Sequence, residues 1–242
     1  MIKFFSQIRH TIIMENSKSA RYLKYALGEI ILVVIGILIA LQINNWNQNR
    51  INKAYELKML RELVEDLKLD TTFMNVQFKR IKRFDESVKL VLNDPQNLKE
   101  NGNLFLFGSV YFIQNTKAIE TIKEGNVQIP FNDNLRKQIN AHYHSSRFYL
   151  DLLSMEDKNF IEFRAIPLQK SQFQIQKNPN SKDFDIEPSV IDYETTIKSK
   201  EFNDYILLRK SRINRWNWAY QKIMESTLES IDSINLYLKE HK

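Results

Sequence analysis

The sequence predicts an all-α fold, in which a single N-terminal transmembrane helix continues into an antiparallel helical bundle with long, coiled-coil-like helices. Three observations predict this fold. One stretch is too apolar for a small soluble domain, and long segments repeat apolar residues every three or four positions. The chain also has only five glycines and five prolines, and so few turn-forming residues favour long helices.

The apolar stretch runs over residues 28–47, GEIILVVIGILIALQINNWN. Its centre, residues 30–41, holds ten Leu, Ile or Val residues beside Gly36 and Ala40. Inserting such a run into a bilayer is favourable by about 3 to 6 kcal/mol. A helix that includes the neighbouring apolar positions would be about 25 Å long, at the short end of the lengths that span a bilayer. The stretch therefore predicts a membrane-spanning helix.

A buried core helix and a cleaved signal peptide both fit this stretch less well. A core helix is rarely apolar on every side, and a cleaved signal peptide would lie nearer Met1 and end in a small-x-small pattern, which is absent here. Tyr22 and Tyr25 before the stretch and Trp46 after it suit the two membrane interfaces. We therefore expect an uncleaved signal anchor, with these three aromatic residues as interface anchors.

The charges around the span predict its orientation. Five basic residues and a single acid, Glu15, precede the span, whereas Glu56 and Glu62 dilute the basic residues that follow it. Because segments richer in Lys and Arg stay inside, we expect an inner-membrane protein with a cytoplasmic N-terminus and a periplasmic body. The predicted domains are a basic amphipathic head over residues 1–25, the transmembrane helix over 26–45, and an extracytoplasmic bundle over 46–242 with a polar linker near 165–199.

One side of the span carries a stripe of distinctive residues, Glu29, Gly36, Ala40 and Asn47. Small residues on one side of a spanning helix permit close approach of another helix. We therefore expect this stripe to contact a second helix, either from another copy of the chain or from another subunit. The alternative is a solitary anchor in which Glu29 reaches the lipid headgroups at the inner end of the span.

The first bundle helix is expected from about Asn45 to Leu92, because no Gly or Pro interrupts this region. Its apolar positions alternate in steps of three and four, as in a coiled-coil seam. They are Leu60, Val64, Leu67, Thr71, Met74, Phe78, Ile81 and Val88, with Phe84 covering an interruption at Asp85.

Residues 104–113, LFLFGSVYFI, are compatible with a short buried helix or with a strand. We expect a helix, because the chain has no second strand-like run to pair with it. A further short helix is expected over residues 116–124, with Gly125 at its C-terminal end.

Two long helices complete the predicted bundle. One begins at Asn132 or Asp133 and ends near Arg164, and the other covers residues 200–239. Between them, residues 169–189 are polar and contain two prolines, which predicts a mobile linker. The apolar faces of the two helices consist of Leu135, Ile139, Tyr143, Leu150, Leu153, Phe160 and Phe163, and of Ile213, Trp216, Tyr220, Ile223, Thr227, Ile231, Ile234 and Leu238.

Several short motifs are distributed over most of the chain. They are Met-Ile-Lys-Phe-Phe at the start, Gly28-Glu29-Ile30 and residues 41–47 at the span, and Phe112-Ile113, residues 119–125, Asn134-Leu135-Arg136 and Tyr143 in the body. In these motifs the chain resembles an uncharacterised family of single-span membrane proteins found widely in Bacteroidota. It departs from the family at Ile122-Lys123-Glu124, where small polar residues are expected. The resemblance implies an inner-membrane location and a domain of unknown function, and it supplies no catalytic residues.

Residues that could carry catalytic chemistry are scarce. The chain has no cysteine, and His142 and His144 point in nearly opposite directions on a helix, so neither a metal nor another cofactor is expected. Glu156-Asp157 and Asp183-Phe184-Asp185 are expected to be solvated. The sequence has no Gly-rich phosphate loop, nucleophile elbow or His-Glu metalloprotease motif, so we do not expect an enzyme.

Two basic clusters, residues 79–83 and 209–212, contribute to the net charge of +6, and their arginines are Arg80 and Arg83 in one and Arg209 and Arg212 in the other. They form a candidate patch for an acidic partner or for anionic headgroups. The alternative is that they are solvated or pair with acids of other helices, such as Glu62 or Asp66. No nucleic-acid partner is expected, because an outward-facing body would not meet one.

These features favour a membrane-anchored helical interaction module that acts through protein–protein contacts, with the lipid bilayer and a protein partner or a second copy as its partners. One alternative is an extracytoplasmic ligand-sensing domain that works through a partner, which a pocket among Trp216, Tyr220 and Tyr143 would favour. Another is a subunit of an oligomeric membrane complex.

Overall fold

The computed structural model describes residues 18–98, 108–124, 133–177 and 186–241. The chain divides into two compact units, Met1–Tyr55 and Glu56–Lys242. In the first unit the described residues all belong to helix α2, and most of the predicted basic head lies outside them. The second unit contains the bundle.

The predicted span and the first bundle helix form one helix, α2 (Lys18–Asn93). No Pro or Gly lies between Asn45 and Asn93, so no residue in this part removes a helical hydrogen bond. A short 3₁₀ helix, η1 (Pro95–Leu98), follows, and the Asp94 carboxylate accepts a hydrogen bond from the Gln96 amide at 3.0 Å.

In the bundle part of α2, two rows of residues with a spacing of seven face the core. The first row is entirely apolar and consists of Leu60, Leu67, Met74, Ile81 and Val88. The second row consists of Glu56, Leu63, Asp70, Gln77, Phe84 and Val91, all of which are buried. The sequence predicts the first row correctly. The predicted seam contains Thr71 and Phe78 in place of Asp70 and Gln77, although the first two are only half-buried.

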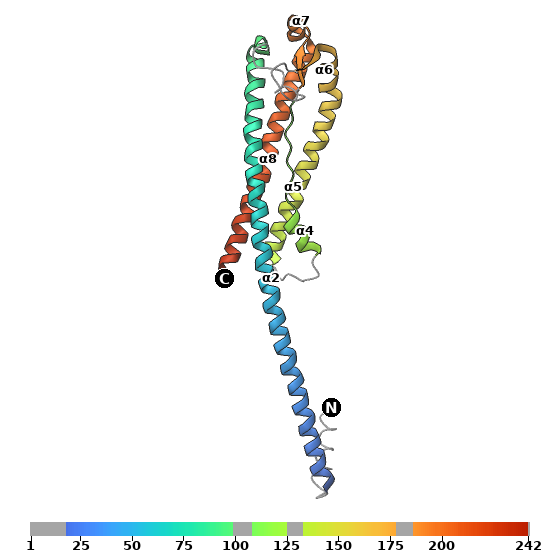
Figure 1. The fold of residues 1–242 in the computed structure, drawn as a ribbon, viewed down its shortest axis with the longest axis vertical. Helices are drawn as coiled ribbons and strands as arrows, with labels where there is room; N and C mark the ends of the chain where they lie inside the picture. Colours follow the sequence, from blue (N-terminus) through green and yellow to red (C-terminus); the bar gives the residue numbers. More distant parts are fainter. Residues whose placement is uncertain (1–17, 99–107, 125–132, 178–185, 242) are drawn as a thin grey trace, which may run out of the picture. The chain divides into compact units, whose positions relative to one another are not determined.

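Helices α5 (Asp133–Phe160) and α8 (Lys200–Glu240) complete the predicted set of three long helices, and the all-α fold class is confirmed (Figure 1). Helix α8 is antiparallel to the other two. Against α2, the late residue Tyr237 of α8 contacts the early residue Glu56, and the earlier Lys210 contacts the later Asp85. Against α5, Ser226 likewise contacts His142, and the earlier Arg212 contacts the later Glu156. Helices α2 and α5 are therefore parallel to each other, so the connection between them must return along the bundle.

This return is made by an extended segment, residues 108–116, which contains no helix (Figure 1). The helix predicted over 104–113 is therefore wrong for residues 108–113, and residues 104–107 lie outside the described part. Val110 and Phe112 are buried whereas Tyr111 and Ile113 are exposed, an alternation typical of extended chain. Extended backbone covers about 3.3 Å per residue against 1.5 Å in a helix, so it suits a connection that must run along the bundle.

Shorter elements surround the ends of α5. The predicted short helix is present as α4 (Lys117–Glu124), and residue 125 lies outside the described part. Helix α5 continues into a π-helical turn, η2 (Ile161–Ala165), and then into α6 (Ile166–Gln172). Pro167 lies in the first turn of α6, and a proline ring excludes the regular helical hydrogen bond at this point. The change of helix type occurs at the predicted end near Arg164.

The stretch predicted as a polar linker contains regular structure that was not anticipated from the sequence. After α6, strands β1 (Phe173–Lys177) and β2 (Ile186–Val190) form an antiparallel pair, and α7 (Tyr193–Lys198) leads to α8. Phe173 and Val190 pair at the base of this hairpin and are both buried. Because these two apolar residues pack into the core, they attach the hairpin to the bundle. Residues 178–185 lie outside the described part.

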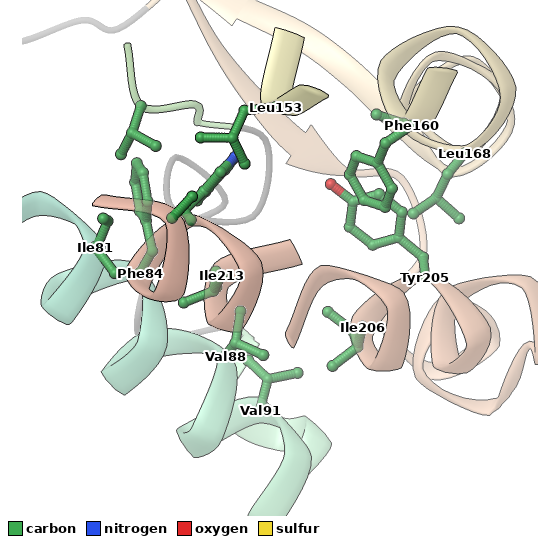
Figure 2. Close-up of a cluster of buried hydrophobic side chains, with 14 of the residues drawn as sticks. Ile81, Phe84, Val88, Val91, Leu153, Phe160, Leu168, Tyr205, Ile206 and Ile213 are labelled. Carbon is green, nitrogen blue, oxygen red and sulfur yellow. The ribbon is translucent and has the colours of Figure 1, made fainter. Parts of the chain in front are cut away.

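Aromatic and aliphatic side chains from the three long helices fill the core. Figure 2 shows Ile81, Phe84, Val88 and Val91 of α2 facing Ile206 and Ile213 of α8. Phe160 at the end of α5 stacks on Tyr205 of α8, with ring centres 5.2 Å apart. The largest fully buried side chain is Trp216 of α8.

Candidate functional site

The N-terminal part of α2 exposes a continuous apolar surface. Its large apolar side chains from Ile30 to Ile43 are each 46% to 71% exposed. This is the one described helix that is long and apolar enough to cross a membrane, and none of its most apolar window is buried. Nothing in the described part of the chain covers this surface.

The predicted interface anchors and stripe residues all lie on this exposed part of α2. Tyr22, Tyr25 and Trp46 are exposed, and the Arg50 guanidinium lies 5.5 Å from the ring centre of Trp46. The stripe residues Glu29, Gly36, Ala40 and Asn47 are also exposed. A Cβ atom added at Gly36 would meet nothing within 4 Å, so the described fold does not require a glycine there.

The four arginines predicted to form one anionic-partner patch do not share a surface. Arg80 and Arg83 are exposed on α2, whereas Arg209 and Arg212 of α8 are only 2% and 9% exposed. The patch prediction is therefore wrong for Arg209 and Arg212. The physical reason is that both guanidinium groups pack against the core ring of Trp216, at 4.8 and 5.8 Å from its centre.

Arg212 pairs with two neighbouring carboxylates that were expected from the sequence to be solvated. Its guanidinium donates hydrogen bonds to both Glu156 and Asp157 of α5, and Asp157 also accepts one from the Trp216 indole at 3.0 Å. Burial raises the pKa of Asp157, and Arg212 opposes this shift. The expectation of solvated carboxylates is wrong at this pair, and Asp183 and Asp185 lie outside the described residues. These contacts link α5 to α8.

Arg209 contributes to a different contact. It lies over the ring of Phe84 at 5.1 Å from its centre and donates a hydrogen bond to the carbonyl of Gly108. Burial lowers the pKa of Arg209 to about 10, so this side chain stays protonated at neutral pH. Arg209 thereby holds the start of the extended segment against α2 and α8.

Buried polar side chains hold the other end of the extended segment. Asp70 of α2 accepts two hydrogen bonds from Asn115 through one carboxylate oxygen, at 3.0 Å from the backbone amide and 2.6 Å from the side-chain amide. Asp66, one turn earlier, accepts a hydrogen bond from the amide of Ala118 at the start of α4. Next to Asn115, the Gln114 amide nitrogen lies 3.2 Å from Nε2 of His142 in α5. These contacts place the segment between α2 and α5.

Asp70 and His142, which both contact the extended segment, have strongly shifted pKa values. Burial raises the pKa of Asp70 to about 6, against a usual value of 3.8. Burial lowers the pKa of His142 to about 4, so its ring is neutral at pH 7. A neutral ring can accept one hydrogen bond and donate the other, which matches the contact with Gln114 on one nitrogen and with Ser226 at 3.0 Å on the other.

The described residues offer little for metal or ligand chemistry. No group of three or more His, Asp or Glu side chains within the described ranges could hold a metal ion. Trp216 and Tyr220 are buried in the core. Tyr143 instead lines a groove between α4 and α5 with polar residues that include His144 and Arg147.

The buried polar residues were not predicted from the sequence, although one signal could have found them. Asp70 and Gln77 occupy the same spacing of seven as Leu63 and Phe84, and this spacing predicts that all four face the core. Because Asp70 and Gln77 are polar, the predicted seam contains Thr71 and Phe78 in their place. No comparable signal identifies His142, whose partners come from two distant segments.

The N-terminal part of the chain is similar to a known protein family. The model of a family of unknown function (DUF6090) matches residues 29–101. The matched part covers α2 from Glu29 to its end, including nearly all of the apolar stretch, and it does not include α5 or α8. No curated protein and no solved structure matches the chain. The match thus relates this part of the chain to an uncharacterised family and assigns no activity to it.

Proposed function

We propose that this protein is a membrane-anchored helical interaction module of the inner membrane, which acts through protein–protein contacts and not as an enzyme. The N-terminal part of α2 crosses the membrane, the short head stays in the cytoplasm and the bundle lies in the periplasm. The resemblance of the span motif to single-span proteins of Bacteroidota agrees with this placement.

The exposed apolar part of α2 is the observation that supports the proposal. A soluble monomer rarely exposes contiguous apolar surface of more than a few hundred Å², and here every large side chain from Ile30 to Ile43 faces outward. Lipid removes this surface from water without any further protein contact. The same helix then continues into the bundle, so one element would both anchor the protein and form its core.

The interior of the bundle supports an interaction role over a catalytic one. The charges of buried Arg212 and partly buried Asp157 pair with each other, and Asp70 uses one oxygen to hold the extended segment. These groups therefore connect elements of the fold. What remains for contact with other molecules is the outer surface of the helices.

The membrane location and the sidedness can be tested with a single introduced thiol. Ser154 is exposed on α5 and the chain has no native cysteine, so Ser154→Cys provides a unique label site. We expect the full-length variant to sediment with membranes and its thiol to react with an impermeant maleimide in intact spheroplasts. Recovery of the full-length protein in the supernatant would contradict the anchor. Labelling only after lysis would contradict the periplasmic placement.

A second experiment tests whether the stripe mediates contacts between copies in the membrane. We expect Gly36→Cys to form disulfide-linked dimers in membranes and Ile37→Cys, its neighbour on another side of the helix, to form far fewer. Gly36 has open space around its Cα, so the new side chain should not disturb the described fold. Equal crosslinking at both positions, or none, would remove the stripe contact and favour a solitary anchor.

A further inference from the structure

One face of α2 carries three cations without a counter-charge. Lys79, Arg80 and Arg83 are exposed, and none of them pairs with a carboxylate in the part of the chain that the structure describes. Three other lysines of the same helix lie 3.8 Å or less from a carboxylate one turn away, namely Lys58, Lys82 and Lys89. These three unpaired cations form the basic face of α2.

The local sequence explains why these charges stay unpaired. No acid lies three or four residues from Lys79 or Arg80, and Glu86, one turn after Arg83, pairs with Lys82. Like charges three or four positions apart destabilise a helix, and no group of the described bundle offsets this repulsion. A local conflict of this kind is typical of a functional surface.

The surroundings of the basic face favour an anion that also carries an apolar group. The three cations line a surface hollow together with Val76 and Phe84, and Val76 is exposed. At the rim, the guanidinium of Arg80 lies 5.8 Å from the ring centre of Tyr111 in the extended segment. This cation–π contact orients Arg80 and leaves its N–H groups available to a ligand.

We propose that the basic face of α2 binds a short acidic segment of a partner protein. Carboxylates of that segment contact Lys79, Arg80 and Arg83, and a neighbouring apolar side chain enters the hollow beside Val76. Guanidinium groups bind carboxylates through paired hydrogen bonds. Membrane-binding basic clusters usually contain about four to eight cations, whereas this face has three within about 6 Å along the helix, which fits a peptide better than a lipid surface.

The test uses the full-length chain in non-ionic detergent and a fluorescein-labelled peptide of Glu-Glu-Phe repeats as the probe. Fluorescence anisotropy measures the affinity for the natural chain and for Lys79→Gln/Arg80→Gln/Arg83→Gln. A matched control, Lys58→Gln/Lys82→Gln/Lys89→Gln, removes the same net charge from the same helix. We expect the first triple variant to bind about tenfold more weakly, since three exposed ion pairs are lost. The control should stay within about twofold of the natural chain, since each cation it removes is already paired.

Three results of this experiment would overturn the proposal that the basic face binds an acidic segment. Equal loss in both variants would show an effect of net charge alone and would overturn the proposal. So would peptide binding that is unchanged in the first variant. If that variant loses binding to phosphatidylglycerol vesicles or changes the mass of the solubilised protein, while peptide binding is unaffected, the occupant is lipid or a second copy and not an acidic segment.

This inference rests on the proposed interaction role, but the two fail separately. Loss of membrane sedimentation would contradict the anchored module, whereas peptide binding in detergent does not depend on the membrane. An unchanged circular dichroism spectrum of each variant would confirm that substitution of these exposed side chains leaves the bundle folded.

Discussion

Replacing Arg212 by Met is expected to lower the free energy of unfolding by about 3 kcal/mol, because the change leaves the partly buried carboxylate of Asp157 without its cation. Asp157 would keep the hydrogen bond from the Trp216 indole but lose the contact with Arg212. Burial already raises the pKa of Asp157, and removal of Arg212 would raise it further. The loss of stability should therefore become smaller as the pH falls and Asp157 takes up a proton in the folded state.

Arg215→Met is a matched control for this prediction. Arg215 lies on the same helix and approaches the same Glu156 at 3.9 Å, but its side chain is about half exposed. Exposed ion pairs contribute about 0 to 1 kcal/mol, so this variant should unfold at nearly the same urea concentration as the natural chain. Urea titration of both variants in detergent, followed by circular dichroism, measures the difference.

A double variant separates the charge effect from simple loss of packing. In Arg212→Met/Asp157→Asn the uncompensated charge is removed, while the amide oxygen of the new side chain can still accept the hydrogen bond from the Trp216 indole. We expect this variant to recover a large part of the stability lost in Arg212→Met. If the double variant is less stable than the single one, packing and not the uncompensated charge explains the loss.

The second large effect is expected at Asp70 as a change in the dependence of stability on pH. The pKa of Asp70 is about 6 in the folded protein and 3.8 in a model peptide. Its stabilising contribution is therefore fully present below pH 3.8 and is lost as the pH rises through 6. This difference in pKa corresponds to about 3 kcal/mol. In Asp70→Asn the side chain can still accept both hydrogen bonds from Asn115, and this contribution at low pH disappears.

His142 changes the dependence of stability on pH in the opposite direction over the same range of pH. Its pKa is about 4 in the folded protein and 6.5 in a model peptide, so its contribution is present above 6.5 and is lost as the pH falls through 4. The size is again about 3 kcal/mol. The groups that face the two side chains are Asp66 and Tyr143 near Asp70, and Gln114, Ser226 and Tyr143 near His142.

In the natural chain the two contributions nearly cancel, so single replacements should reveal them. Relative to the natural chain, Asp70→Asn should lose about 3 kcal/mol of stability between about pH 7 and pH 4, and His142→Gln should gain about the same amount. The exposed residues Asp151 and His144 on α5 provide controls, and Asp151→Asn and His144→Gln should follow the natural chain. Parallel pH profiles for all five proteins would contradict the shifted pKa values.

The sequence is sufficient to predict the long helices. Residues 18–93 contain an uninterrupted apolar stretch followed by a seven-residue repeat, and both patterns depend only on neighbours along the chain. The starts of α5 and α8 could be predicted for the same reason, at Asn132 or Asp133 and at residue 200, and the structure has them at Asp133 and Lys200.

The polar interior could not be predicted in this way. Arg212 and Asp157 are far apart in the sequence, and each is a charged residue of a type that usually lies at the solvated surface. They pair, and Arg212 is buried, because α8 packs antiparallel to α5 and brings them together beside Trp216. The same applies to Asp70 and Asn115, which meet only because the extended segment returns along the bundle.

The amino-acid sequence by itself determined where helices form and which stretch is apolar enough for a membrane, because both properties arise from residues close together in the chain. Only the tertiary structure decided that residues 108–116 are extended, that Arg209 and Arg212 are internal while Arg80 and Arg83 remain outside, and that His142 is buried. The physical reason is that burial and pairing of a polar group depend on partners from other helices. Local patterns carry no information about those partners.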